Sequence, residues 1–131
     1  MGEISTRLFN EEDLNLAEEM MTSAWKFYLQ ETTPERLRQL LEDQLENPAS
    51  KVWLVFENDN PIGIAEISIT ESYRYDGEEA LLKLIFISDT ASNYYDVHSA
   101  LMDTIFGYLR DEGIDYLRVD TTLENADVLL V

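Results

Sequence analysis

The chain has 131 residues, 45% of them hydrophobic and 11% aromatic, and its 27 acidic and 9 basic residues leave a net charge of −18. This length and apolar content suit one domain with one core and argue against disorder, and such an acidic chain should repel nucleic acid and anionic membranes. The lack of cysteine excludes disulfides and thiol chemistry, and a single histidine disfavours a zinc site. The sequence shows no apolar leader and no apolar window of membrane-spanning length, which predicts a cytoplasmic protein.

The acidic residues are spread along the whole chain and do not form a separate tail. A charge of this size predicts attraction for cations. We therefore expect the partner to be a cationic small molecule, such as a polyamine or an aminoglycoside, or a basic protein surface. The alternative is that the charge serves only the solubility of the protein or a saline habitat.

The first third of the chain predicts one strand and two helices. Residues 4–9 alternate in polarity as a strand does. A helix follows with Asn10 as its N-cap and Asp13 at its third position, which resembles a capping box. A second helix begins after Thr33, which is followed by a proline, and it ends at Pro48.

The middle of the chain predicts three consecutive strands. The first covers residues 51–57, and a turn rich in Asn and Asp leads to the second at residues 62–73. The third, residues 80–88, is apolar at nearly every position. A strand of this kind is typical of the centre of a sheet that is covered on both faces.

The last third predicts a helix, a strand and the start of another helix. The first helix begins near Tyr94, with Ser92 or Asn93 as its cap, and a strand follows at residues 114–121. Residues 123–131 are expected to begin one more helix. The buried face of the first helix is predicted from a helical spacing of Val97, Leu101, Ile105 and Leu109.

The predicted order β-α-α-β-β-β-α-β gives an α/β domain with a mixed, mostly antiparallel central sheet flanked by helices, in which the last two strands are parallel. This order resembles the GNAT family of N-acetyltransferases, and within it the aminoglycoside 6′-N-acetyltransferases. The stretches that carry the resemblance are IGIAEISITESYRYDG (residues 62–77), ALLKLIFIS (80–88) and GIDYLRVDTTLENAD (113–127). The resemblance implies transfer of acetyl from acetyl-CoA to an amine.

The resemblance also implies where acetyl-CoA would bind. In that family its pyrophosphate lies after the fourth strand, at an Arg/Gln-x-x-Gly-x-Gly/Ala pattern before a helix. Here Asn93 replaces the Arg or Gln, Asp96 the first glycine and His98 the last small residue. A carboxylate at Asp96 would cap the helix with the protein's own acid and repel phosphate by on the order of 1–4 kcal/mol, so we expect acetyl-CoA binding to be impaired or lost. The implied cofactor-binding positions are Leu84, Ile85, Phe86, Ile87, Asn93, Asp96, Val97 and His98.

Two further interpretations concern the start of this helix. Tyr94 and Tyr95 are expected to close the empty cofactor cleft. His98 is expected to be a surface residue of the helix, because no acidic partner for catalysis lies near it in the sequence.

Acidic and aromatic residues gather around the loop after the 62–73 strand. In the resembled family such residues hold the cationic acceptor amine, and a carboxylate removes its proton directly or through water. The resemblance therefore implies Glu66 and Asp120 as catalytic candidates. A solvated hairpin tip and an aspartate that merely ends a strand remain the alternatives. The implied acceptor-binding residues are Tyr73, Tyr75, Asp76 and Glu78, with Glu79 beside them.

The resemblance implies a single GNAT-like domain over residues 1–131 that is short at its C-terminal end, because family members continue past the position of Asn125. The apolar end of the chain is expected to cover an open sheet edge, unless a partner chain does so, for example in a homodimer.

Three functions stay open. The first is an acetyltransferase-like protein that uses acetyl-CoA if it is active and no cofactor otherwise. The second is a non-catalytic acidic module that binds a basic protein, and the third is a domain that sequesters a small cation. The substituted phosphate pattern and the short end favour the second and third, and no metal is expected in any of them.

Overall fold

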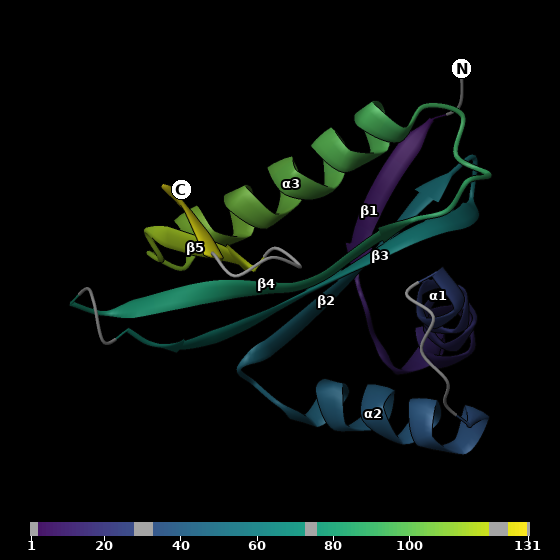
Figure 1. Cartoon of the computed structure of the whole chain (residues 1–131), viewed down its shortest axis with the longest axis horizontal. Helices are drawn as coiled ribbons and strands as arrows, with labels where there is room; N and C mark the ends of the chain where they lie inside the picture. The colour runs from purple at the N-terminus through teal and green to yellow at the C-terminus, as the bar shows by residue number, and fades with distance from the viewer. Residues whose placement is uncertain (1–2, 28–32, 73–75, 121–125, 131) are drawn as a thin grey trace.

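The computed structural model describes residues 3–27, 33–72, 76–120 and 126–130. The predicted strands and helices appear in the predicted order, joined by one short 3-10 helix and one further strand (Figure 1). The elements are β1 (Ile4–Leu8), η1 (Glu11–Asp13), α1 (Leu14–Phe27), α2 (Pro34–Glu46), β2 (Ser50–Glu57), β3 (Asn60–Glu71), β4 (Glu78–Ile87), α3 (Tyr94–Asp111), β5 (Tyr116–Asp120) and β6 (Ala126–Leu130).

The strands form one six-stranded sheet in the order β1-β2-β3-β4-β5-β6, so each strand pairs with its neighbour in the sequence. All neighbouring strands are antiparallel except β4 and β5, which are parallel and are connected through α3. Parallel neighbours need a crossover of this kind, because the end of the first strand and the start of the second lie at opposite ends of the sheet. The mixed, mostly antiparallel α/β sheet is therefore confirmed.

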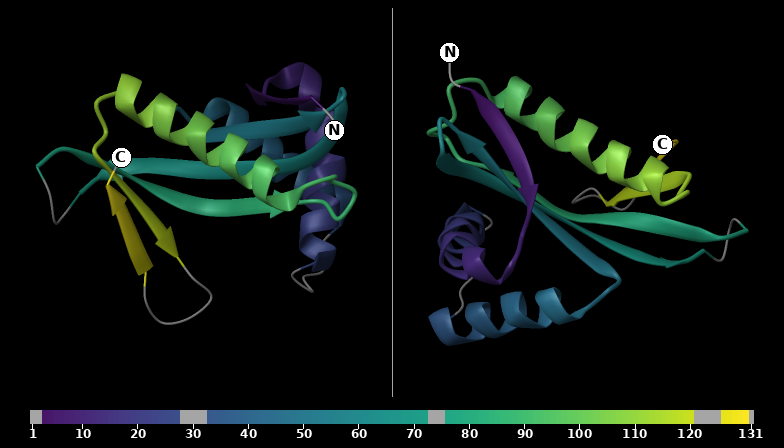
Figure 2. Two further views of the ribbon diagram at one scale, coloured as in Figure 1. Left: turned by 90° about the horizontal axis from the view of Figure 1, so that it is seen from above. Right: turned by 180° about the vertical axis from the view of Figure 1, so that it is seen from behind.

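The sheet separates two layers of helices, with α3 on one face and α1 and α2 on the other (Figures 1 and 2). Along β2, Trp53 and Val55 pack in the cluster beneath α3, whereas Val52 and Leu54 pack in the cluster beneath α1 and α2. The central strand β4 contributes to both clusters, as its nearly continuous apolar run predicts. Within the described ranges, no helix combines the length and apolar character that a bilayer crossing requires.

The predicted helix starts are confirmed by their caps. The Asn10 side chain accepts the Glu12 backbone N–H at 2.9 Å, and the Asp13 carboxylate accepts the Asn10 N–H at 3.3 Å, which completes a capping box. The Thr33 hydroxyl accepts the Arg36 N–H at 3.2 Å at the start of α2. These contacts satisfy backbone donors that the first helical turn leaves without helical partners.

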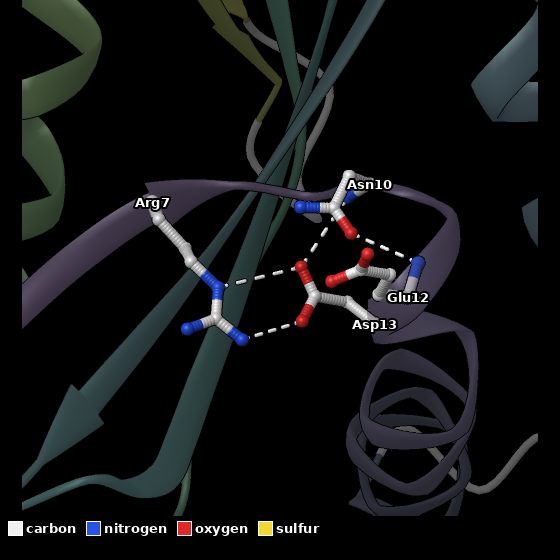
Figure 3. Close-up of polar contacts among 4 residues, drawn as sticks. All are labelled: Arg7, Asn10, Glu12 and Asp13. Carbon is white, nitrogen blue, oxygen red and sulfur yellow. Dashed lines mark hydrogen bonds and ion pairs between the residues drawn. The ribbon is translucent and has the colours of Figure 1, made fainter.

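The capping box of η1, which leads directly into α1, is tied to β1 through an ion pair (Figure 3). Asp13 is buried, and its carboxylate oxygens accept from Arg7 Nη2 at 2.5 Å and Nε at 3.4 Å. The Arg7 guanidinium also lies 4.5 Å from the centroid of the Phe56 ring on β2. A buried carboxylate needs such a partner, so this contact holds the first strand and the first helix at one place on the sheet.

The prediction of a further helix at the C-terminal end is wrong for the described residues. Ala126–Leu130 forms β6, which pairs antiparallel with β5 so that Ala126 lies opposite Asp120 and Leu130 opposite Tyr116. A segment of this length is too short to be a stable helix on its own, whereas the open edge of β5 offers it backbone hydrogen bonds. The expectation that the end of the chain covers a sheet edge agrees with this pairing.

Candidate functional site

The central strand β4 extends beyond its pairing with β5. The register of the two strands covers Ala80–Leu82, while β4 continues to Ile87. Figure 2 shows β5 and β6 turning away from the long β3–β4 ribbon. The predicted cofactor strand, residues 84–87, therefore lies where the sheet diverges. Leu84 and Phe86 pack with the α1–α2 cluster, and Ile85 and Ile87 pack against the α3 cluster.

An irregularity in β4 brings a lysine to the catalytic candidate Glu66. Opposite β3, Leu84 pairs with Glu66 and Leu82 with Ile67, so Lys83 is an extra residue in its strand. A bulge of this kind redirects side chains, and Lys83 and Leu84 both line the same pocket. The Lys83 ammonium lies 3.7 Å from Glu66 Oε2.

This pocket, which we call the Glu66 pocket, lies between the sheet and the helices α1 and α2. It has a volume of about 190 Å³ and a mostly apolar lining. The Glu66 side chain is 13% exposed, and the Ser50 hydroxyl lies 3.3 Å from its Oε2 and also contacts the Gln44 amide oxygen. A nearly buried carboxylate on an apolar wall can hold a cationic group. The lining residues are Met21, Leu37, Leu40, Leu41, Gln44, Val52, Ile64, Glu66, Lys83 and Leu84.

The loop between β4 and α3, residues 88–93, leads into the N-terminus of an 18-residue helix. The predicted cap at Asn93 is confirmed, since its Oδ1 accepts the N–H groups of Tyr95 at 3.0 Å and Asp96 at 3.3 Å. A helix N-terminus of this kind binds anions through such N–H groups. Here a side chain of the protein already accepts two of them.

A second side chain reaches the same loop from β2. Glu57 is 9% exposed, and its Oε1 accepts the backbone N–H of Ser92 at 3.1 Å. Glu57, 35 residues earlier in the chain, is therefore a second acid near the N-terminal end of α3. Asp96, the acid that the sequence predicts there, is exposed at the third helical position. Its carboxylate has no hydrogen bond to another described residue. In this loop and the first turn of α3, side chains of the protein thus already accept the N–H groups of Ser92, Tyr95 and Asp96.

The aromatic residues at the start of α3 do not close a cleft, and that prediction is wrong. Tyr94 is 52% and Tyr95 78% exposed, and their rings meet edge to face with centroids 5.6 Å apart. His98 is half-buried and stacks on Tyr94, as expected for a residue on the helix surface. The side chain of Val97 is fully buried in the core, so only its backbone could face a ligand.

Of the predicted acceptor residues, the described ones, Asp76 and Glu78, do not line the Glu66 pocket. Glu78 lines a separate cavity of about 480 Å³ beside α3, together with Tyr108 and Glu112. Burial, aided by the nearby charges of Glu112 and Glu78, raises the pKa of the Tyr108 hydroxyl. Asp76 is exposed in the turn before β4. Tyr73 and Tyr75 lie outside the described residues.

Two further acidic candidates lie near the paired segments of β4 and β5. Glu79 is buried, with Oε1 2.7 Å from Arg118 Nη2 and Oε2 3.2 Å from the Ser72 hydroxyl. These contacts give Glu79 a structural partner on β5. Asp120 ends β5 opposite Ala126, but its side chain lies outside the described part of the structure. Across the described residues, no group of three or more His, Asp or Glu side chains is arranged to hold a metal ion.

Sequence reasoning missed Glu57 and Lys83. Glu57 carries no local signal, because it is one of many acids and its partner comes from a distant loop. Lys83 does carry one, since it is the only charged residue within the apolar run of residues 80–88. A lone charge inside a buried strand is a sign that the strand has a bulge or a partner.

The comparisons with known proteins agree with this architecture. Residues 6–129 match the family model for the acetyltransferase (GNAT) domain. Similar solved structures include a probable acetyltransferase, with a TM-score of 0.81 and 22% identity, over 94% of this chain and 81% of that chain. AAC(6′)-Iy in complex with the bisubstrate analogue CoA-S-monomethyl-acetylneamine has a TM-score of 0.78 and 17% identity, over 94% of this chain and 82% of that chain.

A third similar structure is a predicted acetyltransferase from Clostridium acetobutylicum with acetyl-CoA, with a TM-score of 0.74 and 15% identity, over 91% of this chain and 81% of that chain. The comparison with curated proteins gives no match. Since the family model covers nearly the whole chain, the protein belongs to the GNAT acetyltransferase family.

Proposed function

We propose that this GNAT-family protein binds a cationic amine in the Glu66 pocket and does not carry out ordinary transfer of acetyl from acetyl-CoA. The observation that carries the proposal is that a side chain of the protein already caps the helix end that follows the β4–α3 loop. The N–H groups of Tyr95 and Asp96 both donate to the Asn93 side chain. A pyrophosphate would have to displace this cap and would also meet the carboxylate of Asp96, and both effects oppose its binding.

The support for an amine ligand comes from the Glu66 pocket and from the charge of the chain. Glu66 already has a cation beside it, because the Lys83 ammonium lies 3.7 Å away. The Lys83 side chain is 46% exposed and flexible, so an amine from solution can take its place. The net charge of −18 raises the local concentration of cations around the protein. The aminoglycoside chemistry named for AAC(6′)-Iy is compatible with a ligand of this class.

A second candidate function is acetyl transfer to such an amine, and the divergence of the sheet favours it. The pairing of β4 with β5 covers Ala80–Leu82 only, and the free continuation of β4 over residues 84–87, the implied cofactor strand, supports this candidate. A third candidate, supported by the charge alone, is an acidic module for a basic protein surface.

Calorimetric titration separates these functions. The wild-type protein is titrated with acetyl-CoA, and separately with spermidine and kanamycin, at moderate salt. We expect no heat with acetyl-CoA at millimolar concentration and saturable binding of at least one amine. Micromolar binding of acetyl-CoA would overturn the first part of the proposal and revive acetyl transfer.

The amine site is tested by Glu66→Gln, with Glu71→Gln as the matched control. Both changes remove one negative charge from β3, but Glu71 is exposed at the end of the strand. A charged hydrogen bond contributes about 1.5–3 kcal/mol, so Glu66→Gln should weaken amine binding by about 10- to 100-fold. Equal binding by the two variants would mean that the amine is held by the general charge of the chain and not by the Glu66 pocket.

A further inference from the structure

Three segments meet at the end of the sheet where β4 leads into α3 (Figure 1). The turn between β2 and β3 is tied to the N-terminal segment, because the Asn58 N–H donates to the Glu3 carbonyl at 2.9 Å. The β4–α3 loop is tied to the first residues of β3, because the Ser88 N–H donates to the Ile62 carbonyl at 2.7 Å. These backbone contacts bring the N-terminal segment, the β2–β3 hairpin and the β4–α3 loop together at one end of the sheet, next to Glu57 at the end of β2.

The Glu57 carboxylate lies at this junction without a basic partner. Among the described residues, no lysine or arginine forms an ion pair with it. Its described hydrogen bond comes from the Ser92 backbone N–H, two residues before the first residue of α3. A carboxylate that is 9% exposed needs compensation for its lost hydration. The Ser92 N–H supplies part of this compensation, and the positive dipole end of α3, which begins two residues later, favours a negative charge in this loop.

We propose that Glu57 is the resident anion of the β4–α3 loop and the residue that excludes a phosphate group from it. The inference deepens the proposed function and rests on it, since it names the side chain that closes the loop. Exclusion acts in two ways. The carboxylate occupies the Ser92 N–H, and its charge repels a second anion at the same helix end.

The two effects are separated by two substitutions. Glu57→Gln keeps an oxygen that can accept the Ser92 N–H and removes only the charge. Glu57→Ala removes both the charge and the acceptor, and it leaves space beside Ser92. The matched control is Asp59→Asn, which removes one charge from the same end of the sheet. Asp59 is exposed, and its positive φ of 68° is one that asparagine tolerates well.

The probes are inorganic pyrophosphate and coenzyme A, titrated calorimetrically into each variant. We expect Glu57→Ala to bind pyrophosphate about tenfold or more tightly than Asp59→Asn, which is the order of the repulsion between two like charges in a partly exposed site. The affinity of Glu57→Gln for pyrophosphate should lie between those of Glu57→Ala and Asp59→Asn. The inference is overturned if both Glu57 variants are folded and bind no better than the control.

A measurement on the wild-type protein keeps the inference testable if the variants do not fold. Hydrogen exchange followed by NMR should show a protected Ser92 amide, although the Ser92 residue itself is exposed. Exchange at the rate of an unstructured chain would mean that the Glu57 contact is absent, and the inference would be wrong.

The outcomes also distinguish this inference from the proposed function. Tight binding of acetyl-CoA by the wild-type protein would overturn both. No binding of acetyl-CoA by the wild type, with no gain on substitution of Glu57, would overturn only the role of Glu57. The loop would then be closed by Asn93 and Asp96 alone.

Discussion

The β4–α3 loop and the Glu66 pocket each contain a charged group of the protein, an acid in the loop and a lysine in the pocket, at the two places to which the proposed function refers. In the loop, the 9% exposed Glu57 accepts a backbone N–H at 3.1 Å. In the pocket, Lys83 lies 3.7 Å from Glu66 and its side chain is 46% exposed. The first contact joins a buried glutamate side chain to a backbone N–H, whereas the second depends on a half-exposed, flexible lysine side chain. Under the proposed function, the loop is closed by a held acid, and the pocket is opened when a ligand displaces Lys83.

The largest expected effect tests whether the Glu57 contact is structural. Glu57→Ala should lower the free energy of unfolding by about 1–2 kcal/mol, because a hydrogen bond to a charged, nearly buried acceptor is lost. Urea denaturation followed by circular dichroism measures it. Asp59→Asn is again the control, since removing one acid also reduces the repulsion within the chain. If the two variants have the same free energy of unfolding, the Glu57 contact does not stabilise the fold, and the contrast between a fixed charge in the loop and a displaceable charge in the pocket is wrong.

The next effect tests whether Lys83 can be displaced. Lys83→Met keeps an apolar stem in the pocket and removes the cation that competes for Glu66. We expect about tenfold tighter binding of the amine found by calorimetry. In this variant the amine no longer has to displace Lys83 from its partly exposed ion pair with Glu66. The control is Lys51→Met, because Lys51 lines the separate cavity beside α3. Equal gains in both variants would show only an effect of net charge.

A somewhat smaller effect is expected at the cap of α3. Asn93→Ala should lower the free energy of unfolding by about 1 kcal/mol, the typical contribution of a helix cap. Asn93→Asp, which keeps the acceptor, should remain close to the wild type. Unchanged stability in Asn93→Ala would mean that water or another group satisfies the Tyr95 and Asp96 N–H groups equally well.

The smallest effect concerns the charge of the whole chain. Raising NaCl from about 10 mM to about 500 mM should raise the melting temperature by a few degrees, because salt screens the repulsion among the excess acids. The same change should weaken amine binding. Because the Glu66 contact is partly buried, some binding should persist at high salt. Complete loss of binding would favour diffuse attraction over a defined pocket.

Much of the fold could be predicted because its signals are local. The caps at Asn10, Thr33 and Asn93 are short-range hydrogen bonds between a polar side chain and the next backbone donors. The run of residues 80–88 predicted a strand buried on both faces, and the helical spacing from Val97 to Leu109 predicted the buried face of α3. The C-terminal strand was missed because its pairing depends on an edge supplied by β5.

The sequence by itself therefore determined the helices and strands of the core, their order and the absence of glycine in the β4–α3 loop. Only the tertiary structure decided which acid lies at that loop and which charge lies in the pocket. Glu57 and Ser92 are 35 residues apart, and Lys83 faces Glu66 because a bulge shifts the register of β4. In a chain with 27 acids, composition cannot single out one of them. Burial and contact across the sheet do so, because a charge removed from water is stable only where a partner is already held in place.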